Sequence, residues 1–514
     1  MAACLGSGCA GEPNIIINNY YTDADSGDTG EEVFEWDAPA ATVSNAAFVS
    51  DLFHGETPNT YWLLCTPAQT AAYNEAVDQN WNGGWGYIPG ELYDSSNRVT
   101  CDALVVKDGG TGAVTWFTNI VITPAGDSTA NYMSASTFSP VKLRLDEGEG
   151  NEGRCINTPE GDCVRNFYLR PDATTNTLGR VVVAKMFPGF PMKDVSPSRG
   201  WLYLNVWTRG PEPVNLEADF DREWRERHSD DYGGEKPAAV IKGQGDLSGG
   251  WTDLGWEIAT ASDAGEELAQ EFIDSLPDFI LNYDPSIHGD FYSYASSQVD
   301  FDETNGGWMH FWAQASAGNV CDSYSFNNMV YVVEDSGLLG KSLASQDYSL
   351  GFCGPEYAPF MGYSDGADSL QTACFQDETC FERAVAVALE DTRALIMADP
   401  VGINAQDYDE LQSLGMARES DASAFARNES YLINLVTTAL PKLGALSQCY
   451  DLRPVDGVLP WTSADGQSGE VYCPYASWGS GERMAPPPAS TNRTRQAPAS
   501  DHKGYTVGEL YRQR

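Results

Sequence analysis

The sequence predicts a mixed α+β fold, with a strand-rich first half and a helix-rich second half. Short β-branched or alternating apolar runs lie at residues 99–108, 114–123, 139–146, 198–208 and 236–243, with glycine-rich turns between the first of them. Helical spacing of apolar residues dominates later, at 263–276, 377–398 and 405–446. We expect a ligand site where the two halves meet.

Local signals support individual elements. Thr66 followed by Pro67 predicts the start of a helix, and Ser262 predicts the cap of another. The run from Gly109 to Gly112 lies between two strand patterns, which favours a hairpin turn over a phosphate-binding loop. Residues 327–336 read as a strand that enters a second hairpin.

The charge balance excludes one class of function. The chain has 514 residues, with 30 Lys plus Arg against 74 Asp plus Glu, and a formal net charge of −44. Such a chain repels phosphate over most of its surface, so a general nucleic-acid-binding surface is not expected. The apolar content of 42% predicts a folded protein. The sequence contains no run of 18 apolar residues, so a membrane-spanning segment is not expected.

The chain contains 12 cysteines, none of them in a C-x-x-C pattern, and five scattered histidines. This favours disulfides and an oxidising compartment over a zinc site or free thiols. Cys155 with Cys163, and Cys374 with Cys380, are close enough in sequence to close local loops. Sequence leaves the other pairings open.

Composition divides the chain into four regions: an anchor and acidic linker at 1–35, a strand-rich lobe at 36–250, a helix-rich lobe at 251–475 with the expected metal and nucleotide site, and a basic proline-containing tail at 476–514. Residues 5–9, Leu-Gly-Ser-Gly-Cys, resemble the end of a bacterial lipoprotein signal, which would make Cys9 the lipidated residue. We therefore expect a secreted or cell-surface protein that touches a membrane only through this lipid.

The tail differs from the rest of the chain. Residues 481–514 carry a net charge of +3 and include the triplet Pro486 to Pro488. Such a segment either lies along an acidic surface, of this molecule or of a neighbour, or is a disordered end.

One constellation of polar residues suggests chemistry. Asp322 and Asn327 lie in an expected loop, and a strand, a turn and a second strand then lead to Asp347. A hairpin of this kind returns Asp347 to the neighbourhood of Asn327, which would gather oxygen ligands of the type that Mg²⁺ or Mn²⁺ prefers. The five-residue Asp-to-Asn spacing recurs elsewhere in the chain, so the prediction depends on the hairpin.

The same stretch, Asn327 to Gly337 followed by Gln346-Asp347-Tyr-Ser-Leu-Gly, resembles the CotH kinase-like family, which is named for a spore-coat protein kinase. Other segments follow in the family's order: 117–128, 139–146, 201–205, 216–221 and 239–243. The resemblance extends over roughly residues 33–400 and implies an atypical protein-kinase-like fold.

The resemblance also implies roles. Asp322 would be the catalytic aspartate, and Asn327 and Asp347 would hold Mg²⁺ or Mn²⁺ together with ATP. Lys142, and less directly Lys242, would neutralise nucleotide phosphates, and Glu217 would hold a lysine in place. The implied activity is phosphoryl transfer from ATP to a secreted or surface protein.

Some positions depart from the family pattern. Thr123-Pro124-Ala125 stands where a basic residue is usual, and Gln346 stands where a Trp is usual. The alternative function is therefore a catalytically inactive surface scaffold, or a structural protein that assembles with copies of itself. An unrelated acidic protein that binds or hydrolyses carbohydrate is a third possibility.

Overall fold

The computed structural model describes residues 46–48, 57–80, 98–125, 132–134, 140–148, 151–157, 163–171, 182, 185–186, 200–205, 210–218, 220–229, 236–244, 255–302, 307–318, 329–333, 342–345, 369–455 and 457–473. Asp322, Asn327, Asp347, Cys9 and the basic tail lie outside these residues.

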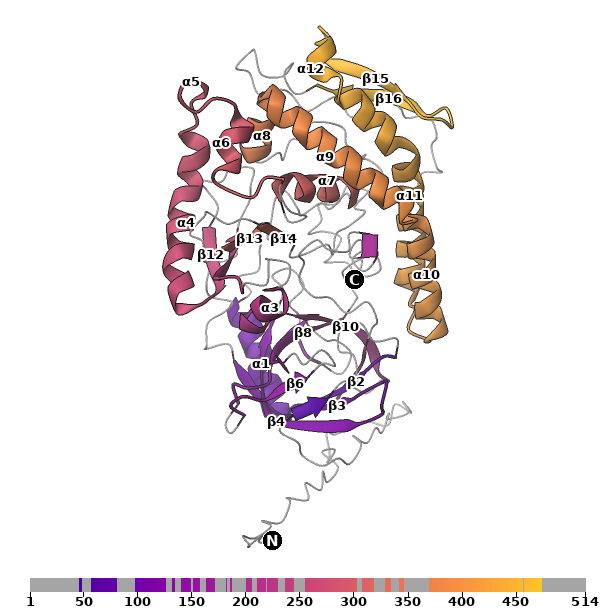
Figure 1. Cartoon of the computed structure of the whole chain (residues 1–514). Helices are drawn as coiled ribbons and strands as arrows, with labels where there is room; N and C mark the ends of the chain where they lie inside the picture. Colours follow the sequence, from indigo (N-terminus) through magenta and orange to yellow (C-terminus); the bar gives the residue numbers. More distant parts are fainter. Residues whose placement is uncertain are drawn as a thin grey trace, which may run out of the picture.

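Seven strands of the first half form a closed barrel (Figure 1). In order around the barrel they are β10 (Glu212–Ala218), β8 (Asn166–Pro171), β5 (Val141–Arg144), β4 (Val114–Pro124), β3 (Val99–Lys107), β2 (Thr60–Leu64) and β9 (Gly200–Leu204). Neighbours are antiparallel except β2 and β9, which run parallel with Thr60 opposite Trp201. Pairing of β9 with β10 closes the ring.

The closed barrel confirms the α+β class and shows that the expected kinase-like arrangement is wrong. A sheet of seven strands that closes on itself is not a kinase-like fold. Closure depends on a pairing between distant segments: the backbone amide of Cys65 donates to the side chain of Asn205, 140 residues later. Periodicity within single strands carries no information about such a pairing.

Alternation of side chains fills the barrel. Val141 and Leu143 of β5 and Phe167 and Leu169 of β8 point inward and are fully buried. Helix α1 (Pro67–Asn80) contacts β3 and β4, and its residues Tyr73 and Val77 join this core. The predicted cap is present, since Thr66 Oγ1 accepts from the amide of Gln69. The alternate positions of β5, β8 and β10 therefore form an outer face, which carries the candidate site.

The described residues form three smaller sheets besides the barrel, one of which is a two-stranded hairpin late in the chain. Strands β1 (Ala46–Phe48), β6 (Cys155–Asn157) and β7 (Cys163–Val164) form one. The second has the order β12 (Gly255–Ala261), β11 (Ala239–Gln244), β13 (Met329–Val333) and β14 (Ser342–Ser345). Because β11 precedes residue 250, this sheet includes chain from both expected lobes.

In Figure 1 most helices lie beside or above the second sheet, and the short helix at Arg222–Arg227 lies between this sheet and the barrel. Their bounds are α3 (Arg222–Arg227), α4 (Asp263–Leu281), α5 (Pro285–His288), α6 (Phe291–Ser296), α7 (Trp308–Gly318), α8 (Ser369–Gln376), α9 (Glu378–Met397), α10 (Pro400–Ser413), α11 (Glu419–Leu446) and α12 (Cys449–Leu452). The hairpin of β15 (Val458–Thr462) and β16 (Ser468–Tyr472) follows and packs on α11. The helical pattern at 405–446 is interrupted after Ser413, where Gly415 has a φ of 67°.

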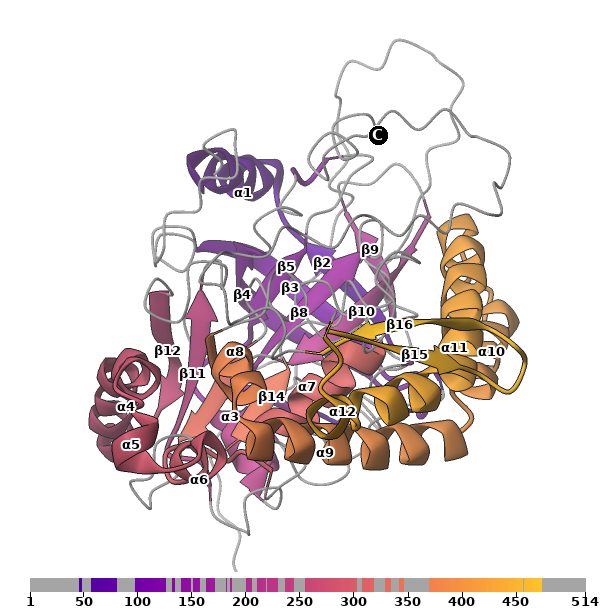
Figure 2. The same ribbon diagram turned by 90° about the horizontal axis from the view of Figure 1, so that it is seen from above.

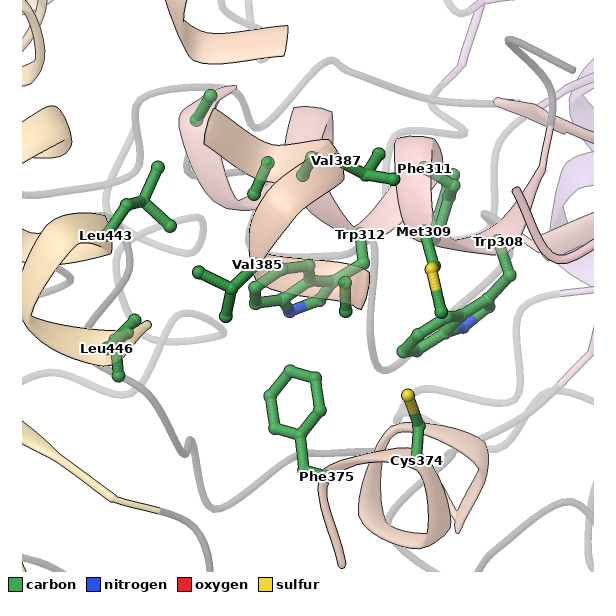
Figure 3. Close-up of a cluster of buried hydrophobic side chains, with 14 of the residues drawn as sticks. Trp308, Met309, Phe311, Trp312, Cys374, Phe375, Val385, Val387, Leu443 and Leu446 are labelled. Atoms are coloured by element: carbon green, nitrogen blue, oxygen red, sulfur yellow. The ribbon is translucent and has the colours of Figure 1, made fainter. Parts of the chain in front are cut away.

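The helical half has its own core, centred on α7 (Figure 3). Trp312 meets Phe375 of α8 edge to face, with ring centroids 5.0 Å apart. Phe311, Val385 and Leu443 bring α7, α9 and α11 into the same cluster. Among the described helices, none combines the length and the apolar character that a membrane crossing requires.

Four disulfides lie within the described residues. Cys155–Cys163 and Cys374–Cys380 confirm the two expected local pairs. Cys65–Cys101 joins the end of β2 to β3, and Cys449–Cys473 ties α12 to the end of β16. This number of disulfides is consistent with a secreted or extracellular protein.

Candidate functional site

Two of the predicted ligand-contacting residues lie on one face of the molecule. Lys142 of β5 and Glu217 of β10 both occupy outward positions of the barrel, on either side of β8. Lys142 is directly opposite Tyr168, and Tyr168 is directly opposite Glu217. The three residues therefore form a straight row across three strands, because directly opposed residues of antiparallel strands share a face.

The side chains of the row interact through the ring of Tyr168 and through an ion pair with Arg170. The ammonium group of Lys142 lies 5.6 Å from the centre of the Tyr168 ring, and the guanidinium of Arg170 lies 5.2 Å from it. Arg170 Nε is 2.8 Å from Glu217 Oε2. Two cations thus flank one aromatic face. Glu217 holds Arg170, a cation that the sequence analysis did not single out.

Two side chains of the row are almost completely buried. Glu217 is 1% exposed and Tyr168 is 7% exposed, whereas Arg170 and Lys142 are half-buried. Asn215 lies directly opposite Arg170 and is 2% exposed, and its side-chain carbonyl oxygen has no hydrogen-bond partner within the described structure. A buried acceptor without a partner is uncommon and costs free energy, which a hydrogen-bond donor placed beside it would relieve.

Three charged residues, Lys142, Arg170 and Glu217, together carry a net charge opposite in sign to that of the chain. Lys142 and Arg170 against Glu217 leave one positive charge in the row, in a protein of net charge −44. Arg144, two residues after Lys142 in β5, donates to Thr123 Oγ1 at 2.7 Å, and its Nε lies 3.3 Å from Glu147 Oε1. An anion that approaches the half-buried cations meets less solvent screening than on an open surface.

The row lies on the side of the barrel that faces the other half. Figures 1 and 2 show β8 and β10 toward α3 and the four-stranded sheet. Asn166 at the start of β8 donates to Asp221, the cap of α3, and Arg225 of α3 donates to the carbonyls of Pro237 and Ala238 just before β11. Arg418 at the start of α11 also donates to the carbonyl of Pro213 in β10. Of these contacts, the one from Arg418 to Pro213 joins the barrel to the helical half, whereas the others connect segments within residues 166–238.

The remaining predicted residues divide into two groups. Lys242 belongs to β11, opposite Glu257 of β12 and Val330 of β13, so it lies in the second sheet and not in the barrel row. Asp322, Asn327, Asp347 and Cys9 lie outside the described residues. The expected hairpin between Asn327 and Asp347 is present as β13 and β14, with Met329 opposite Ser345.

The structure also assembles an ionisable cluster that the sequence analysis missed. His310 Nδ1 of α7 lies 3.0 Å from Asp391 Oδ2 of α9, and Asp302 binds Arg383 and accepts from the hydroxyl of Tyr292. These residues come from four separate segments, and nothing in their spacing indicates that they meet. Burial lowers the pKa of His310, but its hydrogen bond to Asp391 and the nearby carboxylates outweigh burial and raise that pKa overall.

Within the described part of the chain, no group of three or more His, Cys, Asp or Glu side chains is placed to hold a metal ion. Comparisons with models of known families, with curated proteins and with solved structures found no match to this chain.

Proposed function

We propose that this protein is an exported surface protein that binds a phosphate-bearing ligand on the outer face of its barrel. The observation that carries the proposal is the row of Lys142, Tyr168 and Glu217, with Arg170 held beside it. Arg170 supplies a planar set of donors, Lys142 supplies a point charge, and the nearly buried ring of Tyr168 lies against both cations. ATP with Mg²⁺ or Mn²⁺ is the ligand that the family resemblance implies.

The test uses the full chain and measures ATP binding by calorimetry, with and without Mn²⁺. Lys142→Met removes the charge and keeps the apolar stem over Tyr168, so affinity should fall by about tenfold with little loss of stability. Lys107→Met, at the exposed end of β3, is the matched control and should bind as the parent protein does. Equal affinity of all three proteins, or no binding of ATP, pyrophosphate or phosphate, would contradict the proposal.

Phosphoryl transfer is a second candidate, and the β13–β14 hairpin favours it. The described part of this hairpin, with Met329 opposite Ser345, lies in the chain between Asn327 and Asp347. In this proposal Asp322 accepts the proton of a protein hydroxyl, whose oxygen bonds to the terminal phosphorus of ATP while the bond to ADP breaks. Asn327 and Asp347 would hold Mg²⁺ or Mn²⁺, which when bound would neutralise phosphate charge.

Labelling with radioactive terminal phosphate tests the transfer. Asp347→Ala should abolish the label on an acceptor protein, and Asp335→Ala, in the same hairpin, should retain it. If ATP binds in the calorimeter and neither the parent protein nor Asp335→Ala labels any acceptor, the chain is a binding protein that lacks transferase activity.

We also propose that a lipid on Cys9 holds the protein at a bacterial surface, because residues 5–9 resemble a lipoprotein signal. Metabolic labelling with palmitate should mark the parent chain expressed in bacteria. An equally labelled Cys9→Ser variant would rule this out.

A further inference from the structure

Helices α5 and α6 lie at the end of the helical half remote from the barrel (Figure 1). A patch that combines aromatic rings and carboxylates is formed by residues on and beside these helices. We define this aromatic-acidic patch by Tyr283, His288, Tyr294, Asp284, Asp290 and Asp377. The ring of Tyr294 lies 4.6 Å from that of His288 and 5.4 Å from that of Tyr283, measured between centroids. His288 and the adjacent Ile287 are exposed, and the two tyrosines are half-buried.

The three carboxylates are held in place by helix capping. Asp284, Asp290 and Asp377 accept backbone hydrogen bonds at the starts of α5, α6 and α9. Burial and then the charges of these three aspartates raise the pKa of Tyr283, which shows that all three act on one ring. A cation that enters the patch would therefore meet aromatic faces and fixed negative charge together.

One segment of this chain has the matching chemistry. Pro486, Pro487 and Pro488 favour an extended polyproline helix, and such helices bind to surfaces rich in aromatic side chains. Arg483 precedes the triplet, and Arg493 and Arg495 follow it. Arginine stacks on tyrosine and pairs with carboxylates, so the segment can use both features of the patch.

The described chain ends close to this patch. Cys473 is bonded to Cys449 of α12, and Arg453, just after α12, lies 2.8 Å from Glu378, the neighbour of Asp377. The hydroxyl of Tyr450 in α12 donates to the carbonyl of Phe375, two residues before Asp377. About 13 residues separate Cys473 from Pro486, and these reach roughly 40 Å when extended.

We propose that residues 481–495 bind to the aromatic-acidic patch of the same molecule. The bound segment would cover the exposed rings and neutralise part of the acidic surface of the helical half. This inference is independent of the ligand proposed for the barrel.

Trypsin cleavage after Arg493 and Arg495 in the full chain tests the proposal. Asp284→Asn with Asp290→Asn removes two charges, while asparagine keeps both caps. We expect cleavage to accelerate by about fivefold in this double variant and in Tyr294→Leu, and the protection in the parent protein to weaken in 0.5 M NaCl.

Tyr132→Leu, which changes a 42% exposed tyrosine elsewhere, is the matched control and should leave the rate unchanged. Photo-crosslinking from position 485 should join the tail to residues 283–294 within monomers. Cleavage rates that do not respond to the patch variants overturn the proposal. Crosslinks found only in dimers overturn it in favour of binding to a second copy.

Discussion

At the scale of single residues, Lys442 shows what burial of a charge costs. It lies in α11, is 2% exposed, and its ammonium group is 5.1 Å from the centre of the Trp461 ring. Burial lowers the pKa of Lys442 from 10.5 to about 8. Attraction to one aromatic ring does not replace the water that the ammonium loses.

This burial predicts that Lys442→Met stabilises the protein. Between pH 8 and 10.5 the unfolded chain binds more protons at this residue than the folded chain, so stability of the parent protein rises with pH there. At pH 7 the variant should be more stable by about 2 kcal/mol, and the advantage should vanish near pH 10.5. Denaturant unfolding across this range is the measurement. Lys107→Met is the control. If Lys442→Met is no more stable than the parent protein at pH 7, the prediction is wrong.

His310 predicts the opposite dependence on pH. Because the folded state raises its pKa, the protonated ring stabilises the fold fully below about pH 6.5, and this contribution is lost as pH rises through the folded-state pKa. His310→Asn should remove about 1 kcal/mol at pH 5.5 and less at higher pH. Asp391→Asn should remove the same pH-dependent contribution to the free energy of unfolding. A double-mutant cycle with His310→Asn measures this. Additive effects of the two changes would show that the pair is not coupled.

At the scale of elements, local sequence signals predicted many boundaries correctly. The cap at Ser262 and the turn at 109–112 appear as expected, with Ser262 Oγ accepting from Gly265 and Asp108 binding the amides of Gly110 and Thr111. These features are decided within four residues of chain. Helix α7 was missed because its apolar residues, Trp308, Phe311 and Trp312 among them, are buried from several sides and leave little polar alternation.

The Cys449–Cys473 disulfide predicts a stability difference between elements. It closes a loop of 24 residues that holds the β15–β16 hairpin against α11, whereas Cys374–Cys380 spans six. By loop-closure entropy, replacing the first pair by alanine should cost about 3 kcal/mol and replacing the second about 2 kcal/mol. Denaturant unfolding of the two double variants measures the order. The reverse order would show that strain or packing outweighs chain entropy.

At the scale of the whole molecule, the net charge of −44 governs the response to salt. Like charges on a compact body repel, and the screening length falls from about 30 Å at 0.01 M to about 3 Å at 1 M. The melting temperature should therefore rise by about 5 °C between these limits in sodium chloride. Calorimetry at several concentrations tests this, with potassium chloride as a check for ion-specific binding. A constant or falling melting temperature would mean that local pairs compensate the net charge.

Some features of the fold and of the candidate site follow from the sequence, and others follow only from the tertiary structure. Sequence alone determined that the chain is α+β and that two local cysteine pairs join, because each of these depends on residue type and short spacing. Lys142 and Glu217 were predicted only through the family resemblance. Tertiary structure alone decided that the strands close into a barrel, that Tyr168 lies between the two predicted residues, and that Arg170 pairs with Glu217 beside them. It also brought His310 to Asp391 across 81 positions. Long-range contacts of this kind follow from how whole faces bury their apolar surface, and periodicity along one segment cannot specify which distant segment it meets.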